Sequence, residues 1–229
     1  MSAPENRLLS ALPPNDLARL TARTTDVSFG HREVVYRAGG PVGHVYFPRS
    51  GVLSAVLTMS DKTTAEVAVI GSEGMAGFST VLGAVASREE VFCQVHPADC
   101  RKMPVAEFVA EVATCGRLRD VVHGYARAVL DASAQYTACN CLHPIDGRCA
   151  RWLLQCHDRV GADEFPLTHE FLATMLGVRR ATVTEAAGSL QRSGLITYRH
   201  GRVKVLARGQ LEKAACECYR VVRAAFEPT

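Results

Sequence analysis

The stretch "LATMLGVRRATVTEAAGSLQRSGLI", residues 172–196, contains two short helical patterns separated by a single glycine. Thr168 suits the N-cap of a first helix over about 169–176, and Gly177 suits the left-handed turn that ends it. A second helix is expected over about 179–191. Its buried positions would be Val183, Ala186, Ala187 and Leu190. Two helices joined by a tight glycine turn are typical of a helix-turn-helix.

The second helix would expose small and polar side chains at its N-terminal end. An α-helix fits the major groove of DNA, where only the first turns of its exposed face reach base edges. An arginine there can bond guanine through two acceptors, a glutamate can accept from cytosine, and small methyl groups can pack on thymine. The residues expected on this face are Arg180, Ala181, Thr184 and Glu185.

The run "LITYRHGRVKVLA" predicts a hairpin, or wing, with its turn at His200–Gly201. Residues 167–209 carry seven basic and two acidic side chains, although the net charge of the whole chain is only +3. Positive charge at a helix start is disfavoured by the helix dipole, so an external anion is expected beside the arginine pair. Contacts to DNA phosphates are expected from Arg179, Thr182, Arg199, His200 and Arg202. Thr168 is also expected among the DNA-binding residues.

Residues 25–103 show a different pattern, in which short β-rich runs alternate with turn signals. The runs are "EVVY", "HVYF", "GVLSAVL", "TAEVAVI" and "VFCQV". This rhythm predicts a sandwich or a small barrel. Before it, "LLSALPPNDLARL" predicts short helical pieces broken by Pro13–Pro14, and at the other end residues 209–225 predict a single helix.

A long helix over 118–139 carries apolar residues at alternating spacings of four and three. Such a heptad seam usually pairs with a copy of itself, and the alternative is a core helix packed inside one chain. We expect a homodimer. Its interface residues would be Leu118, Val122, Tyr125, Val129, Ala132, Tyr136 and Cys139.

The helix-turn-helix with its wing resembles the DNA-binding domain of the CRP/FNR transcription regulators, and the resemblance covers nearly the whole chain. It implies an α+β fold with three parts: a β-roll sensor over 1–115, cupin-like and related to cyclic-nucleotide-binding domains; a dimerisation helix over 116–142; and a winged helix over 143–229. It further implies a dimeric activator or repressor of transcription that reads inverted half-sites on double-stranded DNA, with RNA polymerase as a further partner.

By the same resemblance, Arg180 matches the guanine-reading arginine of the family, and Thr182 matches a contact to the DNA backbone. The best-known member has glutamate and arginine where this chain has Ala181 and Glu185. The resemblance therefore leaves the operator sequence open.

The nucleotide-binding motif of the related sensors is mostly lost in "EGMAGFSTVLGAVASREEVF". Gly77 falls on the glycine of the motif, but Phe78 replaces the glutamate that holds the ribose. Arg88 falls on the phosphate-binding arginine, but Glu89 follows it and would repel a phosphate, or pair with Arg88 itself. We therefore expect a structural turn here, and a small-molecule or redox effector that is not a cyclic nucleotide.

None of the nine cysteines precedes Cys93, whereas the iron–sulfur members of the family carry clustered N-terminal cysteines. The pairs Cys139/Cys141 and Cys216/Cys218 are spaced i, i+2, which on a helix places the side chains about 200° apart. One such pair cannot chelate one ion without unwinding the helix. We expect buried free thiols, no metal and no cofactor.

No apolar run reaches the roughly 18 residues of a membrane span, and no signal peptide is recognisable. We therefore expect a cytoplasmic protein with no membrane partner. An enzyme is the competing class, but no nucleotide-binding, P-loop or serine-hydrolase motif occurs, and "HEFLA" at His169 lacks the second histidine of a zinc protease. No catalytic residue is expected. A regulatory module without DNA is a second rival, against which the helix-turn-helix argues.

Overall fold

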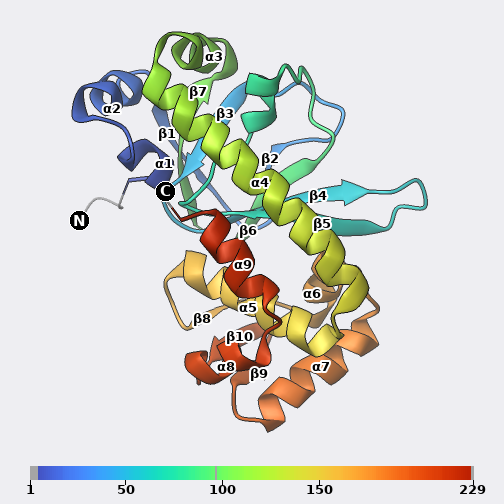
Figure 1. The fold of residues 1–229 in the computed structure, drawn as a ribbon. Coiled ribbons are helices and arrows are strands. Elements are labelled where there is room, and N and C mark those ends of the chain that lie inside the picture. The colour runs from blue at the N-terminus through green and yellow to red at the C-terminus, as the bar shows by residue number, and fades with distance from the viewer. Residues whose placement is uncertain (1–4, 96, 228–229) are drawn as a thin grey trace. The chain divides into compact units, whose positions relative to one another are not determined.

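The computed structural model describes residues 5–95 and 97–227. The chain divides into two compact units. The first consists of the chain up to Leu57 together with Ala68–Val129, and the second consists of Thr58–Val67 together with the chain from Leu130 onward (Figure 1). The sequence-based boundaries at 115 and 142 stay predictions. None of the described helices combines the length and the apolar character that a membrane crossing requires.

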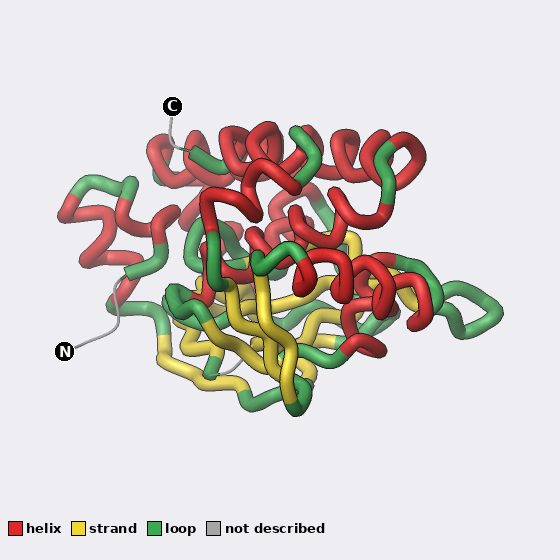
Figure 2. The backbone as a smooth tube through the Cα atoms, turned by 90° about the horizontal axis from the view of Figure 1, so that it is seen from below, coloured by secondary structure: helices red, strands yellow, loops and turns green. Residues whose placement is uncertain are grey.

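The first unit is built on two sheets, whose strands are yellow in Figure 2. The outer strands β1 (Thr25–Phe29) and β3 (His44–Pro48) both pair antiparallel with β7 (Ala98–Pro104). In the second sheet, β2 (Val34–Tyr36) and β4 (Val52–Thr58) both pair antiparallel with β6 (Glu90–Val95). The strand β5 (Thr64–Ile70) lies beside β4. The predicted β-rich region is thus confirmed, and β1 and β7 are two further strands that none of the quoted runs covers.

A cluster of apolar side chains fills the space inside the first unit. Leu53, Val91, Cys93, Ala98 and Cys100 are all fully buried in it. These side chains come from β4, β6 and β7, and at the start of β6 and of β7 buried residues alternate with more exposed ones. Such alternation places every second side chain on the core face of a strand. Cys93 and Cys100 therefore behave as small hydrophobic residues, as expected for buried free thiols.

Two short helices precede the sheets, α1 (Arg7–Ser10) and α2 (Pro14–Thr21). The break between them falls at Pro13–Pro14, as predicted. Asn6 is fully buried, and its side chain accepts hydrogen bonds from the backbone N–H groups of Leu8 and Leu9 at the start of α1. Its amide donates to the backbone carbonyls of Pro48 and Gly74, each at 2.8 Å. One side chain therefore caps the helix and ties it to the sheets.

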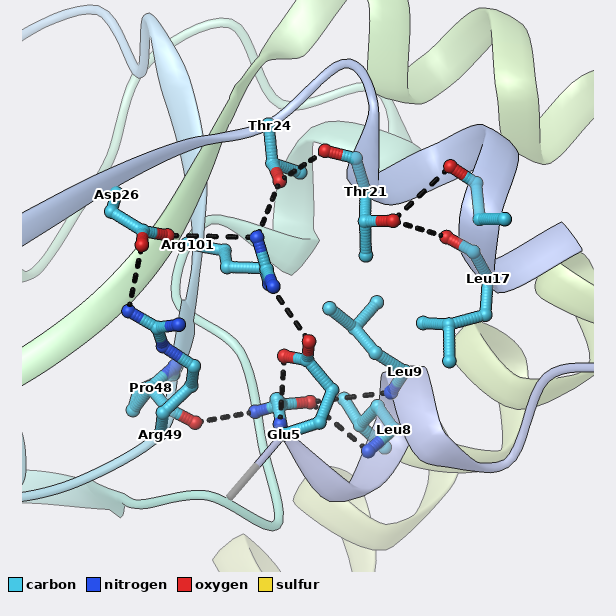
Figure 3. A network of polar contacts seen from close by, with 12 residues as sticks. Glu5, Leu8, Leu9, Leu17, Thr21, Thr24, Asp26, Pro48, Arg49 and Arg101 are labelled. Carbon is cyan, nitrogen blue, oxygen red and sulfur yellow. Dashed lines mark hydrogen bonds and ion pairs between the residues drawn. The ribbon is translucent and has the colours of Figure 1, made fainter. Parts of the chain in front are cut away.

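A network of charged side chains adds to this attachment (Figure 3). Arg101 on β7 lies 2.8 Å from Glu5 and 3.5 Å from Asp26 on β1. Arg49 pairs with the same Asp26 at 3.1 Å. The Arg101 and Glu5 side chains are only about one-fifth exposed, so water screens this pair less than it screens a surface pair. The network holds the N-terminal segment against the edge where β1 meets β7.

After Pro104 the chain is helical, as predicted, with α3 (Val105–Thr114) followed by α4 (Gly116–Leu142). The heptad seam of α4 is mostly covered by the chain itself. The buried members are Leu118, Val122, Tyr125, Ala132 and Cys139, and the half-buried ones are Val129 and Tyr136. Side chains already buried in one chain have little surface left for a second copy, and the assignment of the seam to a dimer interface stays a prediction.

The second unit contains α5 (Ile145–Val160), α6 (His169–Leu176), α7 (Arg180–Arg192), α8 (Arg208–Ala214) and α9 (Cys218–Ala225). Its small sheet has the order β8 (Glu164–Pro166), β10 (Arg202–Val205) and β9 (Ile196–Arg199). The prediction of one helix over 209–225 is wrong, because Ala215 adopts an extended conformation that ends α8.

The core of the second unit is centred on α5, where Leu153 and Leu154 are fully buried and Trp152 is nearly so. The indole N–H of Trp152 donates to the Glu66 carboxylate at 2.6 Å. Glu66 lies on β5, in the short segment Thr58–Val67 that belongs to this unit. A buried indole N–H usually finds such a partner, because leaving it unpaired is costly.

Candidate DNA-binding site

The first helix of the candidate site starts and stops where the sequence predicts. The Thr168 hydroxyl accepts a hydrogen bond from the backbone N–H of Phe171 at 3.1 Å, which confirms it as the N-cap of α6. Gly177 ends the helix with φ of 64°, in the left-handed region that favours glycine. Val178 follows in the turn and is half-buried, with its N–H bonded to the Ala173 carbonyl at 3.0 Å.

The second helix, α7, begins at Arg180, with Arg179 in the N-cap position. No side chain caps this end, so its first backbone N–H groups keep their partial positive charge. The four residues predicted to be buried are all buried: Val183, Ala186, Ala187 and Leu190. The four residues predicted to reach base edges are all exposed: Arg180, Ala181, Thr184 and Glu185. The packing of α7 is therefore confirmed, and its DNA contacts stay predictions.

His169, which sequence reasoning did not count as a site residue, connects both helices and the wing. Its Nδ1 atom lies 3.1 Å from the Thr184 hydroxyl, and its ring meets the Tyr198 ring edge-on at 4.4 Å between centroids. The Thr184 hydroxyl donates to the Arg180 carbonyl at 3.0 Å. Because the one hydroxyl hydrogen of Thr184 is used in that bond, the hydroxyl oxygen can only accept from His169. This favours the His169 tautomer with the proton on Nδ1.

The His169 imidazole lies in surroundings that disfavour a positive charge. Burial lowers its pKa from the ordinary 6.5, and the positive charge of Arg180 lowers it further. Its Nε2 atom is buried without a hydrogen-bond partner in the described chain. His169 is therefore neutral at neutral pH, and it holds Thr184 on the exposed side of α7.

The wing consists of β9, a two-residue turn and β10. Both turn residues have positive φ, 49° at His200 and 72° at Gly201, as a type I′ hairpin turn requires. The predicted turn is therefore confirmed. The strand β8 pairs with β10 on the other side. Arg199 and His200 are exposed at the tip, and Thr182 of α7 is half-buried.

Several cations at this site have no acidic partner. Within residues 5–95 and 97–227, no ion pair engages Arg179, Arg180 or Arg199. Arg202 differs from them, because its Nε atom is ion-paired with the Glu164 carboxylate of β8, and each side chain is about half exposed. The free cations thus gather at the start of α7 and at the wing tip, where a polyanion would be attracted.

In the first unit, the segment that resembles a nucleotide pocket has structural roles instead. Gly77 has φ of 87°, and a Cβ there would lie 3.2 Å from the His44 carbonyl oxygen. Phe78 opens a short 3₁₀ helix, Phe78–Leu82, and its ring meets the Tyr125 ring edge-on at 5.5 Å. The structural turn is therefore confirmed at Gly77, and an aromatic contact occupies the side chain that replaces the ribose-binding glutamate.

The charged part of the same motif is also rearranged. Arg88 is exposed, and Glu89 is half-buried. Glu90 pairs with Arg37 at 3.6 Å rather than with Arg88. A cyclic phosphate at Arg88 would therefore meet one cation flanked by two carboxylates, which is a poor anion site.

Residues 147–214 match the sequence model of the Crp-like helix-turn-helix domain. This match covers α5 to α8 and includes both helices and the wing. No curated protein matches the sequence. The second unit therefore contains a DNA-binding helix-turn-helix domain of the Crp-like class.

Solved structures share the fold of nearly the whole chain. FixK2 from Bradyrhizobium japonicum superposes with a TM-score of 0.72 at 16% identity, over 84% of this chain and 98% of that one. A crp/fnr-family regulator from Eubacterium rectale gives 0.71 at 15% identity, over 91% and 97%. CLP from Xanthomonas campestris, described as a c-di-GMP responsive global regulator, gives 0.70 at 16% identity, over 84% and 99%. The chain thus has the domain and the fold of the CRP/FNR transcription regulators, which confirms the predicted resemblance.

Proposed function

We propose that the chain regulates transcription by reading a specific DNA sequence with the exposed face of α7. The observation that carries the proposal is the position of Arg180. It lies on the first exposed turn of a helix-turn-helix, no ion pair engages it in the described chain, and the end of the helix is uncapped. A guanidinium in this position can meet guanine O6 and N7 together.

The neighbouring side chains on α7 are suited to different parts of the DNA. The Thr184 hydroxyl is held by His169 and by the Arg180 carbonyl, so its methyl group is the part left to pack against a thymine. Ala181 offers a second small apolar surface, and Glu185 can accept from a cytosine amino group. Arg179 and Arg199 are assigned to phosphates, which fix the register of the protein without reading sequence.

The decisive experiment compares two arginine substitutions on the same helix. The operator is first selected from genomic fragments of the source organism. Arg180→Ala should then weaken operator binding by about 1–3 kcal/mol and relax the preference at one base of each half-site, with a smaller effect on random DNA. Arg192→Ala removes the same charge from the last turn of α7 and should leave the base preference unchanged.

Binding to operator and random DNA is measured by fluorescence anisotropy at two salt concentrations, because phosphate contacts alone produce a steep salt dependence. If Arg180→Ala weakens both DNAs equally, Arg180 contacts only the backbone and α7 docks in another way. If the wild-type chain shows no preference for any genomic fragment, the proposed function itself is wrong.

A second copy of the chain is the proposed partner, joined through the exposed side of α4 rather than through the buried seam. Leu130, Ala134, Thr137 and Cys141 are all exposed and are spaced four, three and four residues apart, which places them on one helix face. Leu130, the large apolar side chain of this face, is 69% exposed. Two-fold pairing along this face would present the α7 helices to inverted half-sites about 34 Å apart, beside which RNA polymerase would bind.

A further inference from the structure

Four side chains that can bind a metal, three cysteines and one histidine, meet at one place in the second unit. Cys139 lies in the last turn of α4 and His143 directly follows that helix, while Cys216 precedes α9 and Cys218 is its first residue (Figure 1). Their possible ligand atoms all lie within 4.8 Å of one another. The Cys139 and Cys216 sulfurs are 3.5 Å apart, and the Cys218 sulfur is 3.4 Å from His143 Nδ1.

This grouping brings the cysteines together in a way that their spacing along the chain does not predict. The helical argument holds for Cys139 and Cys141, because Cys141 is exposed and lies outside the cluster. It fails for Cys216 and Cys218, because no continuous helix joins them: Ala215 is extended, and α9 begins only at Cys218. Cys139 and the pair Cys216/Cys218 therefore meet from different elements, which the spacing along the chain does not reveal.

The distances suit a single tetrahedral ion. Around Zn²⁺ with Zn–S bonds of about 2.3 Å and Zn–N bonds of about 2.0 Å, neighbouring ligand atoms stand about 3.5–3.8 Å apart. The two shortest pairs here already match, and the others need shifts of about 1 Å or less. An iron–sulfur cluster distributes its four protein ligands over two or more irons, so at least some of the ligand atoms stand farther apart than ligands that share one ion.

The surroundings of the four side chains match those of a bound metal. A histidine that ligates a metal with one ring nitrogen usually donates the N–H of the other to a carboxylate. His143 has this arrangement, with Nδ1 facing Cys218 and Nε2 lying 3.1 Å from the Glu217 carboxylate. The Gln135 amide donates to the Cys218 sulfur at 3.0 Å, as an amide does beside a thiolate.

The charge of the neighbourhood is also suitable. Arg151 is only 5% exposed, and its Nε atom is buried without a hydrogen-bond partner. In the described parts of the chain no ion pair engages it. Its positive charge acts on the nearby Cys139 and Cys216 side chains. Three thiolates and a neutral histidine on Zn²⁺ carry one net negative charge, which this buried guanidinium would balance.

We propose that Cys139, His143, Cys216 and Cys218 bind one Zn²⁺ ion and so fasten the end of α4 to the start of α9. Because the chain supplies all four ligands, no position is open for water or substrate, which is the mark of a structural rather than a catalytic zinc site. The site is separate from the DNA-reading face of α7 and does not depend on the proposed function.

The experiment measures metal in the full-length chain, purified under reducing conditions without chelators. Plasma mass spectrometry should find about one zinc ion per chain. Cys216→Ser and His143→Asn each remove one ligand and should weaken zinc affinity by at least about 10–100-fold, measured by competition with a chromophoric chelator. Cys141→Ser is the matched control, since it removes a thiol two residues from Cys139 that lies outside the cluster, and it should bind zinc as the wild type does.

Two further variants separate metal binding from a general loss of fold. His143→Cys keeps four ligands and should retain the zinc, while Glu217→Gln keeps all ligands and should weaken affinity by about tenfold with unchanged stoichiometry. With cobalt(II) in place of zinc, the wild type should show the intense visible absorption of a tetrahedral thiolate site. Zinc should raise the Tm of the wild type and of Cys141→Ser, but not that of Cys216→Ser.

Three results would overturn the proposal. The first is a fully reduced chain that is stable and folded by circular dichroism, yet binds neither zinc nor cobalt at micromolar concentrations. The second is a loss of zinc by Cys141→Ser as complete as that by Cys216→Ser. The third is a native Cys139–Cys216 disulfide, found by peptide mapping, that forms equally well in the presence of zinc.

Discussion

The Arg202 guanidinium is ion-paired with the Glu164 carboxylate across neighbouring strands of the wing sheet. The carboxylate competes with DNA phosphate for this cation, so we predict that Glu164→Gln tightens binding to all DNA sequences alike. The salt dependence of binding should steepen by up to about one unit, the contribution of one additional phosphate contact. Anisotropy titrations over a salt series measure both effects.

The control for this first prediction is the double variant Glu164→Gln/Arg202→Ala, which should lose the gain. The stability of the fold should change little, because an exposed ion pair contributes about 0–1 kcal/mol. A tightening confined to the operator would contradict a phosphate contact by Arg202.

The second prediction concerns His169, whose pKa is lowered by burial and by Arg180. As the pH falls below the ordinary value of 6.5, the unfolded chain takes up the proton before the folded chain does. The free energy of unfolding should therefore decrease as the pH falls from about 7.5 to about 5.5. Urea unfolding at both pH values measures this decrease, and His169→Gln should reduce it.

His200 provides the comparison for His169, since it is an exposed histidine in the same domain. Asparagine tolerates the left-handed conformation of that turn residue, so His200→Asn should fold normally and keep the pH dependence of the wild type. An equal loss of pH dependence in both variants would assign the effect to the charge of the domain as a whole.

The third prediction is that neither cyclic AMP nor cyclic GMP binds tightly. Phe78 packs against Tyr125 where the ribose needs a carboxylate, and each ligand polar group left unpaired in a buried site costs about 1–3 kcal/mol. Titration calorimetry should show no binding at micromolar protein concentrations. Sub-micromolar binding of either nucleotide would mean that the ring contact opens readily.

The fourth prediction places the dimer contact on the exposed side of α4. Leu130→Glu should shift sedimentation from dimer to monomer, because it puts charge in the middle of an apolar contact. Mild oxidation should crosslink two copies through exposed Cys141, so Cys141→Ser should abolish the crosslink. Cys139→Ser should leave it intact, since Cys139 is fully buried beside Cys216. A wild-type monomer at micromolar concentration would remove the basis of the dimer.

The helix-turn-helix was predictable because its signals are local. Thr168 caps α6, Gly177 supplies the left-handed turn, and the apolar period of α7 identifies its buried face. Each of these depends on a few neighbouring residues, so tertiary packing had little to override. The strands β2 to β6 were predictable for the same reason, from short β-rich runs between turns, whereas β1 and β7 lie outside those runs.

The contacts that sequence reasoning missed join residues that are distant along the chain. His169 meets Thr184 fifteen residues away, and Cys139 meets Cys216 seventy-seven residues away. The burial of the α4 seam was missed for another reason: a helix packed inside one chain and a helix paired with a copy have the same apolar period. Only the positions of the other elements distinguish the two.

The unit that contains the DNA-binding domain is formed by two separate segments of the sequence, which the hydrogen bond between Trp152 and Glu66 joins. A fragment that begins at residue 130 would lack Thr58–Val67, and the buried indole N–H would lose its partner at a cost of about 1–3 kcal/mol. Such a truncated fragment is expected to be less stable than the same domain in the intact chain. A chimaera that exchanges the DNA-binding domain between relatives therefore needs a crossover on each side of the segment Thr58–Val67, as well as one within α4.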